Sequence, residues 1–231
     1  MTTVVITGAN RGLGLALAQY YSARGSSVIA GCRKPADASE LAATGAEVHE
    51  LDLADDGSLT AFAGQVGSRP VDVLINNAGI DARALGADDA ARGALAITAE
   101  QYLGVINVNV VGPLRMVQLL ADNLRAARGK VANISSQVGS FEVAKRIGRD
   151  AAYSSSKAAL NMVTIKQSQA LSADGVVVIA LHPGWVRTDM GGGGADVDPA
   201  DSAAGVAAVI EAATIESTGS FFRWDGTIHP W

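Results

Sequence analysis

Cysteine, histidine and aromatic side chains are scarce in this sequence of 231 residues. Cys32 is the one cysteine, three residues are histidine, and aromatic residues make up 5% of the chain. One cysteine cannot form an internal disulfide or a cysteine metal cluster, and the histidines lie far apart in the sequence. We therefore expect a protein without a bound metal, from a reducing compartment such as the cytoplasm.

The sequence also lacks an excess of basic residues and any long apolar run. It has 18 Lys and Arg against 23 Asp and Glu, which gives a net charge of −5. This balance provides no electrostatic attraction to nucleic acids or acidic membranes. The start, MTTVVITGAN, has no signal-peptide pattern, and no apolar run of about 18 residues follows it. We expect a soluble protein that binds neither nucleic acid nor membrane.

Glycine and apolar residues, by contrast, are abundant. Glycine accounts for 26 residues, and hydrophobic side chains make up 48% of the chain. A chain of this length and hydrophobicity can bury one large core, so we expect residues 1–231 to form a single domain. The glycine run at 191–194 then indicates a loop and not a domain border.

Short β-branched runs alternate with helical stretches along the chain. Several of the runs are apolar on both faces, as in a parallel sheet that helices cover on both sides. The pattern predicts a doubly wound, Rossmann-like α/β fold. The expected strands are 3–7, 27–31, 46–50, 71–75, 130–135 and 176–181. The expected helices are 13–24, 57–66, 99–128 with an interruption near Gly112 and Pro113, 151–173 and 201–213, while 80–99 is mainly loop.

A glycine-rich turn follows the first expected strand and leads directly into a helical stretch. Glycines allow a tight turn and the close approach of a diphosphate, whose charge is favoured at the positive end of a helix. Three glycines after a strand can also form a plain turn, and their spacing is not the literal G-x-G-x-x-G string. The candidate dinucleotide contacts in this turn are Gly8, Asn10, Arg11, Gly12, Leu13 and Gly14.

The end of the second expected strand indicates which dinucleotide is bound. The residues there are Gly31-Cys32-Arg33-Lys34, without the carboxylate that NAD-binding folds usually place on the ribose hydroxyls. A guanidinium pairs with a ribose 2′-phosphate, which a carboxylate would repel. Arg33 therefore favours NADP(H) over NAD(H), with Arg11 as a second phosphate contact. The alternative is that Arg33 is a solvated surface charge.

Tyr153 and Lys157 are the candidate catalytic pair. They are four residues apart in a helical stretch, so they share one helix face. An ammonium about 5 Å away favours the phenolate by roughly 3 kcal/mol at an effective dielectric near 20. The spacing therefore predicts a lowered pKa for Tyr153. Ser136 ends the fifth expected strand, at the sheet edge where such folds bind ligands, and its hydroxyl can bind a carbonyl oxygen. Taken singly, each of these features also occurs as an ordinary helix or turn element.

In this order, the motifs resemble the short-chain dehydrogenase/reductase family from Thr3 to the end of the chain. They are Thr7-Gly8-x-x-x-Gly12-x-Gly14, Asn76-Asn77-Ala78-Gly79, Asn109, Ser136, Tyr153-x-x-x-Lys157 and Pro183-Gly184. The sequence is most similar to the branch of C-factor-like and sniffer-like carbonyl reductases, through Gly-Cys-Arg at 31–33, the segment 182–190 and the tail from Trp224 to Trp231. The resemblance implies a sheet with strand order 3-2-1-4-5-6-7.

The resemblance also implies roles for individual residues. Tyr153 is the acid/base, Lys157 activates it and binds the nicotinamide ribose, and Ser136 holds the substrate oxygen. Asn109 supports a proton relay through water, although the residue alone equally suggests a buried amide bonded to backbone. The further implied cofactor contacts are Asp52 and Leu53 at the adenine, Asn77, Ala78 and Gly79 at the ribose, and Pro183, Gly184, Val186 and Thr188 at the nicotinamide.

These features predict an NADPH-dependent reductase that converts a ketone or aldehyde to an alcohol, or catalyses the reverse reaction. Two alternatives remain: a non-catalytic NADP(H)-binding module that signals redox state to a partner, and a cofactor-dependent epimerase or dehydratase. The resemblance suggests a homodimer or homotetramer packed through the helices at 99–128 and 151–173. The substrate is expected to be a small carbonyl or alcohol compound.

Two loops are the candidate determinants of substrate choice. The loop at 189–200 is rich in glycine, and we expect it to have few fixed contacts and to cover the substrate as a lid, with Trp185 and Met190 as apolar walls. The segment between Ser136 and Tyr153 is longer than is usual in the family. Its Lys145, Arg146 and Arg149 either meet an anionic substrate or belong to a solvated loop.

Overall fold

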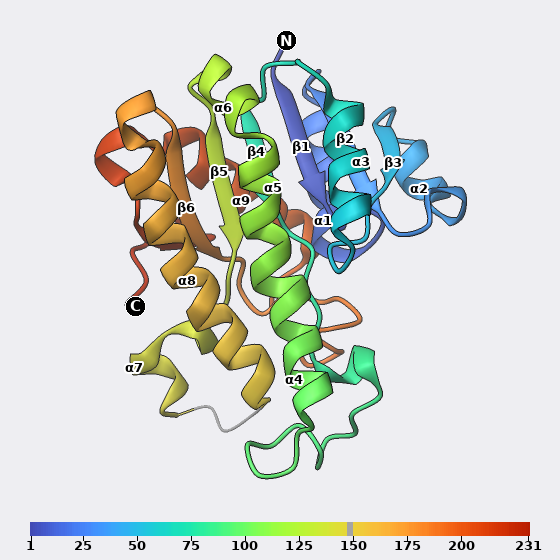
Figure 1. Ribbon diagram of the computed structural model, residues 1–231, viewed down its shortest axis with the longest axis vertical. Coiled ribbons are helices and arrows are strands. Elements are labelled where there is room, and N and C mark those ends of the chain that lie inside the picture. Colours follow the sequence, from blue (N-terminus) through green and yellow to red (C-terminus); the bar gives the residue numbers. More distant parts are fainter. Residues whose placement is uncertain (147–149) are drawn as a thin grey trace.

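A single seven-stranded parallel sheet forms the centre of the molecule in the computed structural model, which describes residues 1–146 and 150–231 (Figure 1). The strand order is β3-β2-β1-β4-β5-β6-β7, with helices on both faces, so the predicted doubly wound α/β fold is confirmed. The strands are β1 (Thr3–Thr7), β2 (Ser27–Cys32), β3 (Glu47–Glu50), β4 (Val73–Asn76), β5 (Lys130–Ile134), β6 (Val177–His182) and β7 (Phe221–Arg223).

The central strands are buried on both faces because their apolar runs meet a helical layer on each side. Val4 and Ile6 of β1 pack into a core with α1 (Gly12–Ser22) and α9 (Pro199–Ala212). Val5, which points to the other face, packs into a core with α3 (Asp56–Val66) and the helices beside it. Figure 1 shows α3, α5 (Gly112–Leu119) and α8 (Ala151–Leu171) in front of the sheet and α1 and α9 behind it.

The expected helices lie close to their predicted ranges, with one difference at 99–128. This stretch is α4 (Ala99–Ile106), a π-helical turn (Asn107–Val111), α5 (Gly112–Leu119) and α6 (Ala121–Ala127). The predicted interruption near Gly112 and Pro113 is therefore a widened turn just before them, and α5 begins at Gly112 with Pro113 in its first turn, where its missing N–H costs nothing. A second break, at Leu120, was not predicted.

Within the described ranges, no single helix is long and apolar enough to cross a membrane. Only the pair Ala99–Leu119 and Ala121–Ala127 meets that criterion together, and it is bent by 60° at the break.

The remaining elements are short and lie mainly in the loops around the carboxyl edge of the sheet. Three of them begin at a residue whose side chain accepts a backbone N–H: Asp81 before η2, Ser136 before η4 and Ser140 before α7. The long helix α8 (Ala151–Leu171) begins the same way at Asp150. The short elements are η1 (Pro35–Asp37), α2 (Ser39–Ala42), η2 (Ala82–Leu85), η4 (Gln137–Gly139), α7 (Phe141–Ala144), η5 (Ser172–Asp174) and η6 (Ile215–Ser217).

The loop predicted at 80–99 is anchored to the helices beside it. It contains η2, and Ala82 and Ala87 pack with Val105 of α4 and Ala152 of α8 in a small apolar cluster. This cluster fixes the loop next to the first turn of α8, which carries Tyr153. Since all strands are parallel, the loops after β1, β4, β5 and β6 meet at one edge of the sheet.

Candidate active site

The glycine turn after β1 is a cradle that has no room for side chains. Gly8 and Gly12 have φ of +67° and +55°, a region that L side chains rarely adopt. A Cβ on Gly14 would lie 2.2 Å from the Gly8 carbonyl oxygen, and one on Gly8 would lie 2.8 Å from Ala78. Arg11, the N-cap of α1, makes no side-chain capping bond, so the first amide groups of α1 remain open to an anionic ligand.

Asn77 ties this turn to the end of β4. Its amide nitrogen donates to the carbonyl oxygens of Thr7 and Gly8, both at 3.0 Å. The backbone N–H groups of Asn77 and Ala78 both donate to Thr7 Oγ1 at 3.1 Å. The side chain assigned to the cofactor ribose by resemblance is thus used to hold the glycine turn in place.

The residues expected around the adenosine differ in how tightly they are held. Arg33 is exposed at the end of β2. Arg11 donates to Asp189 across an exposed ion pair of 2.7 Å, which joins the glycine turn to the loop after β6. Leu53 is buried against Gly112, and Asp52 accepts a hydrogen bond of 2.9 Å from the backbone of Ala54. The positive charge expected for a 2′-phosphate is therefore accessible at Arg33.

Ser136, Tyr153 and Lys157 meet at the carboxyl edge of β5. Ser136 caps η4, and its side chain lies close enough to Tyr153 to lower the pKa of that phenol. The Lys157 ammonium is buried, donates to the Ile134 carbonyl oxygen at 2.8 Å and lies 5.5 Å from the centre of the Tyr153 ring. The structure therefore brings together the three residues that were singled out from the sequence.

The predicted lowering of the Tyr153 pKa is wrong for this structure. Burial raises the pKa of Tyr153 to about 12, and the negative charges of Asp81 and Asp150 act in the same direction. The Ser136 side chain opposes them only in part. Burial also lowers the pKa of Lys157 to about 8, and its ammonium points to a backbone carbonyl. The spacing along the helix correctly predicted that Lys157 lies beside Tyr153, but burial decides the direction in which the pKa of Tyr153 shifts.

Asn109 has all its hydrogen-bonding groups in use, within the π-helical turn. Its carbonyl oxygen accepts from Ile80 N at 2.8 Å, while its amide nitrogen donates to Ile80 O at 2.8 Å and to Ser156 Oγ at 2.9 Å. The alternative of a buried amide bonded to backbone therefore describes its observed contacts. A Cβ on Gly79 would lie 3.3 Å from Asn109 Oδ1 and 3.5 Å from Lys157 Nζ, so Asn109 borders the lysine.

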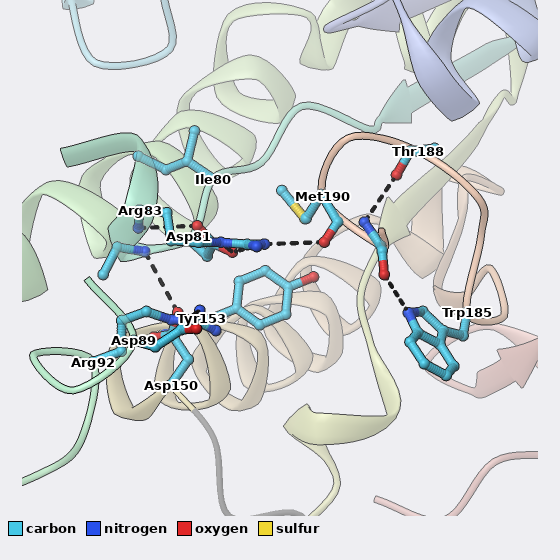
Figure 2. A network of polar contacts seen from close by, with 12 residues as sticks. Ile80, Asp81, Arg83, Asp89, Arg92, Asp150, Tyr153, Trp185, Thr188 and Met190 are labelled. Atoms are coloured by element: carbon cyan, nitrogen blue, oxygen red, sulfur yellow. Dashed lines mark hydrogen bonds and ion pairs between the residues drawn. The ribbon is translucent and has the colours of Figure 1, made fainter. Parts of the chain in front are cut away.

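A network of charged residues beside Tyr153 was missed in the sequence (Figure 2). Arg83 pairs with Asp81 at 2.6 Å, and Arg92 pairs with Asp150 at 3.2 Å. Asp150 in turn accepts from Tyr153 N at 2.9 Å and so caps α8. The capping position of Asp150, three residues before Tyr153, was a readable signal. The pairs with Arg83 and Arg92 depend on how the loop at 80–98 folds back.

The loop after β6 is anchored, so the expectation that it has few fixed contacts is wrong. Val186 and Val197 form a parallel bridge, and Trp185 Nε1 donates to Gly191 O at 2.9 Å. Thr188 Oγ1 accepts from Gly191 N at 3.2 Å, and its methyl group would lie 3.0 Å from a Cβ on Gly12. The bridge closes the base of the loop beside the glycine turn.

The other residues expected near the nicotinamide lie at the start of this loop. Gly184 has φ of +88°, and the Pro183 carbonyl oxygen accepts from Ser202 at 2.6 Å. Lys145 and Arg146 are exposed after α7, and Arg149 lies outside the described residues.

Comparison with known proteins identifies a family and relatives for this chain. Residues 2–196 match the family model described as short chain dehydrogenase. The C-signal protein of Myxococcus xanthus is 42% identical over 176 residues, which is 75% of this chain and 100% of that protein. The 1-hydroxy-2-glutathionyl-2-methyl-3-butene dehydrogenase of Rhodococcus sp. (strain AD45) is 32% identical over 100% of both chains.

Solved structures show the same likeness across the whole chain. The NADPH-bound carbonyl reductase from chicken fatty liver superposes with a TM-score of 0.89 at 31% identity, covering 100% of this chain and 99% of that one. The carbonyl reductase Sniffer of D. melanogaster gives a TM-score of 0.88 at 28% identity and covers 100% of both chains.

Proposed function

Because the chain belongs to the short chain dehydrogenase family of oxidoreductases, we propose that it catalyses the NADPH-dependent reduction of a ketone or aldehyde to an alcohol. The observation that carries the proposal is the meeting of Ser136, Tyr153 and Lys157 beside the glycine turn. A dinucleotide-binding fold alone would not require a hydroxyl, a phenol and an ammonium at this one place. The carbonyl reductases among the structural neighbours support the same reaction class.

The residues present fit NADP(H). The cradle of Gly8, Gly12 and Gly14 accepts backbone contacts only, and the uncapped start of α1 suits a diphosphate. Arg33 is exposed where a 2′-phosphate would lie, and no carboxylate occupies the end of β2. When bound, the coenzyme supplies the hydride. The adenine would be held by Asp52–Leu53, the ribose by Asn77–Gly79 and the nicotinamide by Pro183–Thr188.

The protein's own part in the reaction is to position the carbonyl group and to deliver a proton. Tyr153, with its pKa raised to about 12, keeps its proton at neutral pH and can donate it to the carbonyl oxygen. Ser136 holds the same oxygen as negative charge develops on it. Below its pKa of about 8, Lys157 is mainly protonated and provides a cation beside the phenol. This arrangement suits the direction of reduction.

NADPH consumption with a panel of ketones, aldehydes and diketones tests the proposed activity. We expect at least one class of carbonyl compound to oxidise NADPH stoichiometrically, with the alcohol identified by mass spectrometry. Binding of NADPH with no consumption for any compound would favour the redox-sensing module. A changed substrate without net NADPH consumption would favour an epimerase or dehydratase.

Arg33→Ala tests the preference for the phosphorylated coenzyme. The change removes charge-assisted hydrogen bonds to the 2′-phosphate, so we expect the Kd of NADPH to rise by about 10- to 100-fold. The Kd of NADH, which lacks that phosphate, should stay within about twofold of the wild-type value. Both constants can be measured by fluorescence titration. An equal loss of affinity for the two coenzymes would mean that Arg33 acts on the fold of the site and not on the phosphate.

Two further features belong to this proposal. The loop at 189–200 is the substrate loop, and its apolar walls are Met190 and Trp185, which precedes the loop; their side chains are exposed by 40% and 49%. The assembly is a homodimer or homotetramer packed through α4 to α6 and α8. Leu103 and Met162, exposed by 64% and 55% on these helices, support such packing.

A further inference from the structure

Arg83 reaches from η2 across to the loop after β6. Its Nη2 donates to the Met190 carbonyl oxygen at 3.0 Å, over a separation of 107 residues in the sequence. Figure 2 shows the Arg83 side chain running along the Tyr153 ring toward Met190, with the Tyr153 hydroxyl directed to the same side. Arg83 therefore borders the space that a substrate must enter to reach Tyr153.

Asp81 holds the Arg83 guanidinium by one edge only. Both Nε and Nη2 donate to Asp81 Oδ2, at 2.9 and 2.6 Å. The Asp81 side chain is only 11% exposed, whereas that of Arg83 is 45% exposed. Asp81 is itself fixed, because its Oδ1 accepts from Arg83 N at 3.0 Å. Asp81 thus holds the guanidinium from behind and fixes its orientation.

The outer edge of the guanidinium has only a weak partner. It consists of Nη1 and the second N–H of Nη2, and among the described residues its one acceptor is the neutral Met190 carbonyl. A guanidinium presents parallel N–H groups at the spacing of the two oxygens of a carboxylate. A carboxylate is also the stronger acceptor, because the hydrogen bonds are then charge-assisted on both sides. A ligand carboxylate could therefore take the place of the Met190 oxygen.

Nearby cations are less suited to this task. Arg92 pairs with both Asp89 and Asp150, and its side chain is 12% exposed. The Lys157 ammonium is buried and donates to a backbone carbonyl. Lys145 is exposed after α7 and is not one of the residues of the network beside Tyr153. Of the cations in the network beside Tyr153, Arg83 alone combines exposure with a fixed orientation.

We propose that Arg83 binds a carboxylate of the substrate, so that the compound reduced at Tyr153 is an oxo acid. This inference rests on the proposed carbonyl reductase activity and adds the chemical class of its substrate. Asp81 is the positioning residue that orients the guanidinium. The exchange of the Met190 carbonyl for the ligand carboxylate frees the loop after β6 from η2 as the substrate enters.

Methyl-ketone acids of increasing chain length, each compared with its neutral methyl ester, test the inference. We expect wild-type kcat/KM to favour the acid over the ester by about 10-fold or more at the length that spans Arg83 and Tyr153. Arg83→Met should abolish most of that preference. Arg115→Met is the matched control, since Arg115 makes a two-bond pair with Asp56 on the outer face of α5, and it should keep the preference.

Calorimetric titration of the same acids and esters gives the comparison without turnover. The acid should bind wild-type protein more tightly than the ester, and Arg83→Met should remove the difference. The double variant D81N/R83M, which leaves no unpaired buried carboxylate, should do the same if the single variant folds poorly. Equal binding of acid and ester by wild-type protein, or a preference that survives both variants, overturns the inference. Either result can occur while esters still oxidise NADPH, so the proposed reductase activity would stand.

Discussion

Tyr153→Phe is expected to lower kcat for carbonyl reduction by about 10³-fold while the Kd of NADPH changes little. The variant keeps the ring and removes only the hydroxyl that would protonate the carbonyl oxygen. Because the pKa of this hydroxyl is raised to about 12, it is in the proton-donating form throughout the neutral range. Single-turnover rates of NADPH oxidation and fluorescence titration of NADPH measure the two quantities separately.

Tyr20→Phe is the matched control for this change. Tyr20 lies near the end of α1, with the Arg24 guanidinium 3.5 Å from its ring centre, far from the hydroxyls of Ser136 and Tyr153. Its removal should leave kcat within about twofold of wild type. A Tyr153→Phe protein that binds NADPH normally and retains more than about a tenth of wild-type kcat would show that the proton comes from another group. A parallel loss of NADPH binding would instead point to a role in the coenzyme site.

The fold could be predicted from local signals because each of the longer strands is a continuous apolar run between helical stretches. The apolar runs of β1, β2, β4, β5 and β6 occur within two residues of their expected ranges. A parallel sheet buried on both faces leaves little choice but such runs. The seventh strand, Phe221–Arg223, has no such pattern and was not located. Three residues are too few to show a period.

In the candidate site, too, some features could be predicted from the sequence and others could not. Tyr153 and Lys157 could be placed together because a separation of four residues fixes a common helix face. The direction of the Tyr153 pKa shift could not be predicted, because it depends on burial and on Asp81, which is 72 residues away in the sequence. The link from Arg83 to Met190 spans 107 residues and depends on two loops that carry no periodic signal.

Gly14 is the glycine of the turn whose surroundings exclude a side chain most strictly. It has no positive φ, so conformational freedom does not explain it. What excludes a side chain is space: a Cβ would lie 2.2 Å from Gly8 O, 2.5 Å from Asn77 Nδ2 and 3.0 Å from Ala9 Cα. Two of these three neighbours are backbone atoms, and the third is the amide that holds the turn to β4. None of them can yield without moving the cradle.

Gly14→Ala is therefore expected to destabilise the fold by about 1–3 kcal/mol and to raise the Kd of NADPH at least about 10-fold. The shift needed to accommodate the methyl group would break the bonds from Asn77 to Thr7 and Gly8, and with them the close approach of the turn to a diphosphate. Denaturant unfolding measures the first effect and fluorescence titration of NADPH the second.

Gly64→Ala is the control that separates steric exclusion from the general cost of a glycine in a helix. Gly64 lies in α3, and a Cβ there would meet nothing within 4 Å. Because alanine favours the helical state over glycine, this variant should be more stable by up to about 1 kcal/mol. If Gly14→Ala lowers the stability and Gly64→Ala raises it, the effect at Gly14 is due to the closeness of the Gly8 carbonyl. If both variants were stabilised and bound NADPH equally well, the glycine turn would not be the tight diphosphate cradle described above.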